Sequence, residues 1–175
     1  MIRHIFQKDV RRLWWAILPS LALTAMLARG DRWRSDYMPG PVEGWLNLLL
    51  PVVWAALIAL AVEQEPIAGD RQFWITRPYR RGALLAEKAL FAAVFVHAPY
   101  LLLEWYVVGS RGFSPVGALP HVLWKQVMLA GAVTLPALAL ASLFRSFTHF
   151  ILVVFAIAVV SVVISGRMQY GFVLL

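Results

Sequence analysis

The sequence predicts an all-α fold, a polytopic bundle of about five membrane-crossing helices. Three observations predict it: 61% of the 175 residues are hydrophobic, only 14% are charged, and the mean hydropathy is +0.73. An average soluble domain has roughly a quarter charged residues, so this chain has too few polar side chains to cover a soluble globule of its size. The composition therefore argues against a soluble enzyme domain and against a disordered chain, which needs low hydrophobicity.

The first twelve residues predict an amphipathic helix that lies in the membrane interface. Its apolar face comprises Ile2, Ile5, Phe6, Val10 and the following Leu13. The rest of its surface carries Arg3, Gln7, Lys8, Arg11 and Arg12, a pattern typical of helices at a lipid surface. The alternative is the basic start of a signal peptide. We disfavour it because no small-x-small cleavage site follows, and Trp14-Trp15 is unusual in the apolar part of a signal.

Residues 13–175 predict one transmembrane domain, because a membrane-crossing helix needs about 20 mostly apolar residues and five stretches come close to that length. The predicted spans are Leu13–Ala28, Trp45–Val62, Ala83–Val108, Gln126–Phe144 and Phe150–Gly166. An isolated strand would leave backbone groups unpaired in lipid, so each stretch is expected to be a helix. Four spans contain a proline, which predicts kinks rather than helix ends, since neighbouring groups can satisfy the freed carbonyls.

The lysines and arginines predict the orientation. With a cytoplasmic N-terminus, ten of the 16 basic residues fall in inside segments and six fall outside, as the positive-inside rule requires. The net charge of +7 is attributed to this topology. Nucleic acid is not an expected partner, because no basic, aromatic-interleaved face remains once the apolar runs lie in lipid. We therefore expect a multi-pass protein of the inner or plasma membrane, in contact with the lipid bilayer.

The longest polar segment on the predicted cytoplasmic side is residues 63–88. Two carboxylates end the second span, a turn-forming cluster follows, and the apolar group Phe73, Trp74 and Ile75 would dip into the interface. Arg77-Pro78 then interrupts the backbone, because a residue before proline avoids the α region. Two interpretations stay open: a docking surface for a soluble partner, or an ordinary positively charged loop with interfacial aromatic residues.

This segment resembles the region between the second and third spans of permease subunits of ABC-2 type transporters. In that family a glutamate ends the second span, a glycine follows, and a Pro-x-x-Arg element leads into a third span that contains a lysine. The matching positions are Glu63 or Glu65, Gly69, Pro78, Arg81 and Lys88. The string FWITRP at 73–78 is similar to the form in a subset of these permeases, and the N-terminal helix resembles the family's elbow helix.

The resemblance implies a six-span permease half that pairs with a second copy or a homologous half, and a separate ATP-binding subunit that docks on residues 63–88 and hydrolyses ATP. The docking residues are then Glu63, Glu65, Gly69, Arg71, Trp74, Arg77, Pro78, Arg81 and Lys88. No G-x-x-x-x-G-K-[ST] phosphate loop occurs in the chain, so ATP hydrolysis is expected in the partner. Because five spans are counted, we expect a permease truncated after the fifth span or a short form that a partner completes.

Other candidate sites are few. His97 lies near the middle of the third span, where an ionisable residue is costly and is by default a functional candidate. The alternative is a neutral histidine that hydrogen-bonds a neighbouring span. The small residues of the fourth and fifth spans fit either close helix packing or the lining of a substrate path; they are Ala130, Thr134, Ala137 and Ala141, then Ala158, Ser161 and Ser165.

No catalytic residue, cofactor or metal is expected. The chain has no cysteine, and its histidines lack the spacing of metal ligands. Two other functions are alternatives to the permease. One is an accessory or structural membrane protein without a transport path. The other is a membrane-embedded lipid-modifying enzyme, for which Glu63, Glu65 and Asp70 would be the acidic cluster.

Overall fold

The computed structural model describes residues 2–32, 41–64, 81–114, 116–144 and 146–172. These residues form helices and short turns, and no strand occurs among them. The all-α prediction is therefore confirmed for the described part of the chain.

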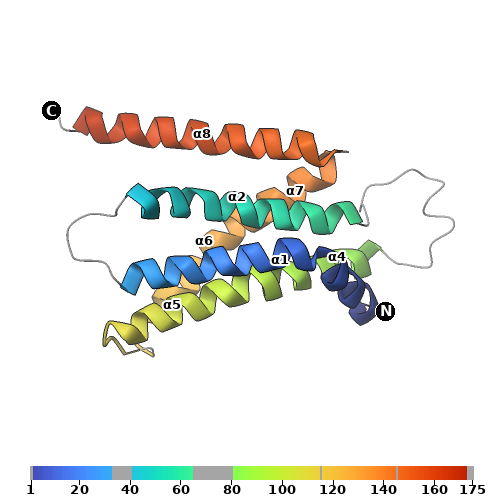
Figure 1. Cartoon of the computed structure of the whole chain (residues 1–175), viewed down its shortest axis with the longest axis horizontal. Helices are drawn as coiled ribbons and strands as arrows, with labels where there is room; N and C mark the ends of the chain where they lie inside the picture. Colours follow the sequence, from blue (N-terminus) through green and yellow to red (C-terminus); the bar gives the residue numbers. More distant parts are fainter. Residues whose placement is uncertain (1, 33–40, 65–80, 115, 145, 173–175) are drawn as a thin grey trace.

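The helices follow one another as an up-and-down bundle (Figure 1). They are α1 (Ile2–Arg32), α2 (Pro41–Gln64), α4 (Arg81–Ala92), η1 (Ala93–His97), α5 (Ala98–Ser110), α6 (Leu119–Leu129), η2 (Ala130–Thr134), α7 (Leu135–Leu143) and α8 (Phe147–Phe172). The two η elements are π-helices. Each continues directly into its neighbours, so α4–η1–α5 and α6–η2–α7 are two long helical runs joined by a short turn.

The bundle has two ends at which different helices begin and finish. At the N-terminal end, on the right of Figure 1, α1, α4 and α8 begin while α2 and α7 finish. At the far end α5 finishes and α6 begins. The helices on either side of residues 65–80 thus meet the first turns of α1 at the same end.

Helix α1 contains both the predicted interfacial helix and the predicted first span as one continuous α-helix, with Pro19 inside it. Its buried residues follow each other at intervals of three or four, which is the spacing of one helix face; they are Ile5, Asp9, Leu13, Ile17, Ser20 and Thr24. Figure 1 shows that the first turns run at an angle to the rest of the helix. The first turns are therefore held to the bundle by the same face as the span.

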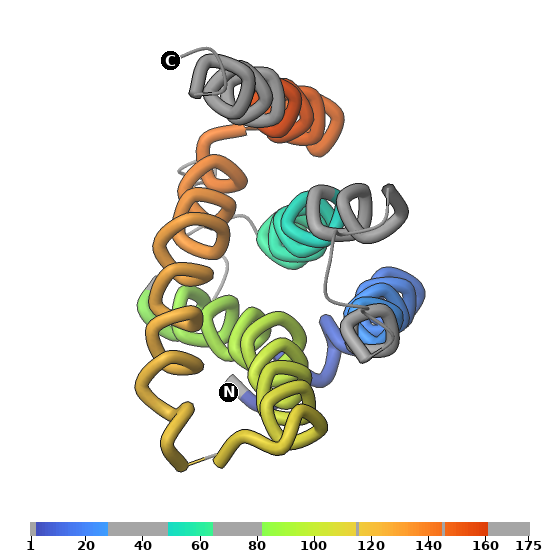
Figure 2. The backbone as a smooth tube through the Cα atoms, turned by 90° about the vertical axis from the view of Figure 1, so that its left-hand side faces the viewer, coloured from blue at the N-terminus to red at the C-terminus, as the bar shows by residue number. Residues whose placement is uncertain are grey.

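Helix α2 lies at the centre, with α1, α7 and α8 around it (Figure 2). From Leu50 to Val62 most of its side chains are buried, and the others are apolar and half-buried. A helix that is hydrophobic all round is typical of the middle of a bundle or of a membrane. Trp54 of α2 packs edge-on against Tyr100 of α5, with ring centroids 5.4 Å apart.

Two described runs are long and apolar enough to cross a membrane: Gly82–Ser110, with 29 residues, and Leu119–Leu143, with 25. Two shorter apolar helices accompany them, Leu49–Gln64 and Phe147–Val160. Only 28% and 17% of the apolar windows of the two long runs are buried inside the bundle. A core helix of a soluble protein would bury most of such a window, so these helices present apolar side chains outward.

Candidate functional site

Three charged side chains are buried together at the N-terminal end of the bundle. Asp9 of α1 and Glu87 of α4 are 0% exposed, and Lys88 of α4 is 1% exposed. The Lys88 Nζ donates a hydrogen bond to Asp9 Oδ2 at 2.5 Å and lies 2.9 Å from Glu87 Oε2. We call Asp9, Glu87 and Lys88 the charge cluster. It joins the first turns of α1 to the first turns of α4.

The spacing of residues along both helices explains why these charges are inside. Asp9 occupies the buried face of α1, four residues after Ile5 and four before Leu13. Glu87 and Lys88 occupy the buried face of α4, between Leu84 and Phe91. Burying a charge is costly unless a partner compensates it, and here Lys88 of α4 is the partner of both Asp9 and Glu87.

Aromatic rings pack beside the charge cluster. Phe6 of α1 stacks on Phe95 of η1 at 5.9 Å between centroids and meets Phe91 of α4 edge-on at 6.3 Å. Phe91 and Phe95 are themselves 4.9 Å apart. Phe6 and Phe91 each lie three residues from a member of the ion pair along their helix, so the rings are its apolar neighbours. An apolar environment strengthens the attraction between two charges.

A fourth residue balances the charge of the cluster. One lysine and two carboxylates carry a net negative charge when all are ionised. The Nζ of Lys8, on the exposed side of α1, lies 3.8 Å from Asp9 Oδ1. Lys8 therefore supplies a second positive charge at the rim, and the four groups together are neutral.

Of the nine predicted docking residues, the structure describes the side chains of Glu63 and Lys88. Glu63, at the end of α2, accepts a hydrogen bond from the backbone N–H of Phe147 at 2.7 Å. Phe147 is the first residue of α8, so the carboxylate satisfies one of the free N–H groups of that helix end and favours its dipole. Helix α4 begins at Arg81. The other predicted docking residues lie outside the described residues: Glu65, Gly69, Arg71, Trp74, Arg77 and Pro78.

The structure does not bring Glu63 and Lys88 to one another. Glu63 contacts the start of α8, whereas Lys88 contacts Asp9 of α1. Residues 65–80 are thus flanked on each side by a side-chain link to a different helix. Glu63 links the end of α2 to α8, and Lys88 links α4 to α1. Four helices are therefore connected at the two ends of residues 65–80.

His97 forms a second polar site, inside the apolar part of the bundle. Its Nδ1 lies 2.9 Å from Gln126 Oε1 of α6, and its Nε2 lies 3.0 Å from Thr134 Oγ1 of η2. A neutral ring with its proton on Nδ1 satisfies both contacts, because Nδ1 then donates to the amide oxygen and Nε2 accepts from the hydroxyl. The geometry agrees with the interpretation of His97 as a hydrogen-bonding link between spans.

The His97–Thr134 hydrogen bond joins two π-helices. His97 is the last residue of η1 and Thr134 is the last residue of η2, and each is followed two positions later by a proline, Pro99 or Pro136. Proline lacks an N–H and its ring clashes with the carbonyl four residues earlier. The wider π turn before each proline accommodates that clash without ending the helix.

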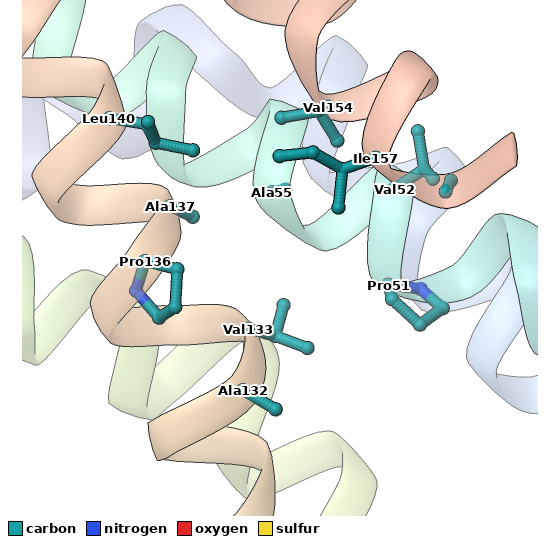
Figure 3. Close-up of a pocket in the computed structure, with 11 residues that line it drawn as sticks. Pro51, Val52, Ala55, Ala132, Val133, Pro136, Ala137, Leu140, Val154 and Ile157 are labelled. Atoms are coloured by element: carbon teal, nitrogen blue, oxygen red, sulfur yellow. The ribbon is translucent and has the colours of Figure 1, made fainter. Parts of the chain in front are cut away.

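An apolar cavity of about 270 Å³ lies between α2, the η2–α7 run and α8 (Figure 3). Its lining is entirely apolar: Pro51, Val52, Ala55, Ala132, Val133, Pro136, Ala137, Leu140, Val154, Ile157 and Ala158. Ala137 and Ala158 belong to the small-residue faces of the predicted fourth and fifth spans. Among the described lining residues, none offers a polar side chain to orient a polar solute.

The far end of the bundle has its own ion pair. Lys125 of α6 donates to Glu104 of α5 at 2.7 Å, with side chains 37% and 13% exposed. The pair closes the turn between the two long helical runs. Among the described residues, no three His, Cys, Asp or Glu side chains are grouped so as to hold a metal ion.

Comparison with known proteins adds no relative. No protein-family model, no characterised protein and no solved structure matches this chain.

Sequence reasoning missed Asp9 and Glu87. Asp9 is the only acidic residue among the first twelve, and it lies on the apolar face of the helix rather than on the basic one. That position is a usable signal, because an acid on a buried helix face needs a basic partner. Lys88 was singled out, but as a docking residue rather than as that partner.

Proposed function

We propose that this chain is a multi-pass membrane protein that serves as the permease subunit of an ABC-2 type transporter. In this proposal residues 63–88 form the cytoplasmic surface on which a separate ATP-binding subunit docks. The observation that carries the proposal is the buried contact between Lys88 and Asp9. It connects α4, which contains the last residues of this segment, to the basic N-terminal helix α1. The resemblance to these permeases rests on this segment and on that helix.

The apolar outer surface supports the membrane part of the proposal. The two long runs expose most of their apolar windows, and bulky side chains such as Leu102, Leu135 and Phe155 are exposed on three different helices. Exposed apolar area of this extent is stable in lipid, where it meets hydrocarbon instead of water. We propose that α1, α2 and α8 cross the bilayer together with the two long runs, which gives five spans.

The side-chain links of Glu63 and Lys88 support a coupling role for the segment between them. A displacement of residues 65–80 would act on α2 and α4 through the backbone. It would also act on α8 through Glu63 and on α1 through Lys88. A docked ATPase changes the conformation of the bundle only if it binds two states of this end with different affinity. The four linked helices are the candidates for such a two-state element.

Co-purification tests the docking role. The full chain is expressed with the ATP-binding subunit encoded next to it, and the complex is captured through a tag on the ATPase. Arg77→Glu and Arg81→Glu together are expected to abolish capture, because they reverse two charges of the docking segment. Arg111→Glu, a charge reversal at the far end, is the control and should leave capture intact. Unchanged capture of the Arg77 and Arg81 variant would contradict the proposal.

Two observations favour a second candidate, an accessory membrane protein without a transport path. Both ring nitrogens of His97 are bonded to protein groups, and the cavity beside α2 has an apolar lining. A chain with this role would assemble stably with a membrane complex that contains no ATPase.

A further inference from the structure

The exposed side of the first turns of α1 forms a basic concavity of about 360 Å³. It is lined by His4, Gln7, Lys8, Arg11 and Arg12, so every lining side chain can donate a hydrogen bond and none is acidic. The opposite face of the same turns is buried through Ile5, Asp9 and Leu13. Packing of that face fixes the helix, and the basic side chains therefore project from an anchored surface.

The position of this concavity along α1 indicates which layer of a bilayer would surround it. The exposed surface changes from basic to apolar within a few residues: Arg12 is exposed, and so are Trp14, Trp15 and Leu18 just beyond it. A helix rises about 1.5 Å per residue, so Arg11 and Trp14 are about 4.5 Å apart along the axis. Tryptophan is enriched at the boundary between hydrocarbon and headgroups, which places the concavity at the depth of the lipid phosphates.

We propose that this concavity binds the phosphate headgroup of an anionic phospholipid of the surrounding bilayer. The proposal rests on the membrane-crossing part of the proposed function. A guanidinium group donates two parallel hydrogen bonds to phosphate oxygens, so Arg11 and Arg12 are the main contacts. Lys8 contributes less because it also faces Asp9. The apolar surface that begins at Trp14 would hold the acyl chains, and this is why a lipid rather than a soluble phosphate is the occupant.

Native mass spectrometry of the full-length protein in detergent tests this site. Phosphatidylglycerol and phosphatidylcholine with identical chains are titrated separately, and the wild type is expected to bind phosphatidylglycerol more tightly. Arg11→Gln and Arg12→Gln should each weaken that binding about five-fold, the effect of about 1 kcal/mol per basic residue at an anionic surface. Arg3→Gln is the matched control, since Arg3 is an exposed arginine of the same helix outside the lining.

The outcomes distinguish binding in this concavity from a general attraction between the basic helix and anionic lipids. A loss at Arg3→Gln as large as at Arg11→Gln would overturn the proposal, and so would equal binding of the two lipids by the wild type. The double variant Arg11→Lys with Arg12→Lys keeps the positive charges but removes the planar guanidinium groups that donate two parallel hydrogen bonds. It should bind phosphatidylglycerol more weakly than the wild type and more tightly than the double glutamine variant.

Flotation with vesicles of phosphatidylcholine alone distinguishes this inference from the proposed function. A protein that floats with these vesicles but shows no preference for phosphatidylglycerol would overturn the headgroup site alone. A protein that fails to insert into any vesicle would overturn the headgroup site and the membrane-crossing proposal together.

Discussion

Lys88 and Asp9 are 79 positions apart in the sequence, yet their side chains form a hydrogen-bonded ion pair that is closed to solvent. The pair fixes the start of α4 against the first turns of α1. Glu87 lies beside the buried pair, and Lys8 lies at its exposed rim.

Lys88→Met is expected to destabilise the protein by about 3–5 kcal/mol, because it leaves buried carboxylates without their cation. Lys125→Met removes the lysine of the partly exposed pair with Glu104 and should cost about 0–1 kcal/mol. The measurement is the free energy of unfolding in a denaturing detergent, with both variants in the same lipid mixture. Equal losses for the two variants would contradict the assignment of Lys88 to a buried pair.

The hydrogen bond between His97 and Thr134 should be measurable as a coupling energy. His97→Ala, Thr134→Val and the double variant form a double-mutant cycle, and we expect a coupling of about 0.5–1.5 kcal/mol, the range found for hydrogen bonds between helices in membranes. His97→Ala combined with Thr148→Val is the control, since Thr148 is an exposed threonine on α8. Additive losses for His97 and Thr134 would mean that the two π-helices are not linked by this bond.

Glu63 should protect the first amide of α8. Glu63→Ala removes the acceptor of the Phe147 N–H and is expected to cost about 1 kcal/mol, with faster hydrogen exchange at residues 147–150. Glu63→Gln keeps an oxygen acceptor and loses only the interaction of the charge with the helix dipole, so it should cost about 0.3–1 kcal/mol. A glutamine variant that exchanges as fast as the alanine variant would contradict the capping role.

The cavity beside α2 should accept a larger side chain. Ala137 lines it and is 3% exposed, and Ala59 of α2 is equally buried but is not among the lining residues. Ala59→Leu is expected to cost about 1–3 kcal/mol because it overpacks the core. Ala137→Leu should cost less or stabilise the protein, since the new methyl groups occupy existing space. The comparison of the two unfolding free energies checks this, and a larger loss at Ala137 would count against the cavity.

The sequence patterns were sufficient for the helical fold because apolar run length and helical spacing are local properties. Each predicted span lies along one helix or one continuous helical run, with Phe144 one residue beyond the end of α7. Pro99 and Pro136 pointed to irregular helices, but the π turns before them depend on how the backbone absorbs each ring. Pro19 and Pro51 stay within α-helix, so proline alone did not predict the π geometry.

The charge cluster was less accessible from sequence. Asp9 and Lys88 could each be recognised as a charge on an apolar helix face, but their pairing depends on which helices pack together across 79 positions. The partners of His97 also depend on helix packing. Gln126 and Thr134 lie on the α6–η2–α7 run, which packs against the run that contains His97. Helix-to-helix contacts are tertiary information, which periodicity along one segment does not contain.

The proposed function requires residues 63–88 to lie on the cytoplasmic side of the membrane. Cysteine labelling tests this location most directly. The chain has no cysteine, so Trp74→Cys and Ser110→Cys each introduce a single thiol, the first in the proposed docking segment and the second at the end of α5. In sealed cells a membrane-impermeant maleimide is expected to label Ser110→Cys, and to label Trp74→Cys only after permeabilisation. Labelling of Trp74→Cys in sealed cells would place the segment outside and would contradict docking of a cytoplasmic ATPase.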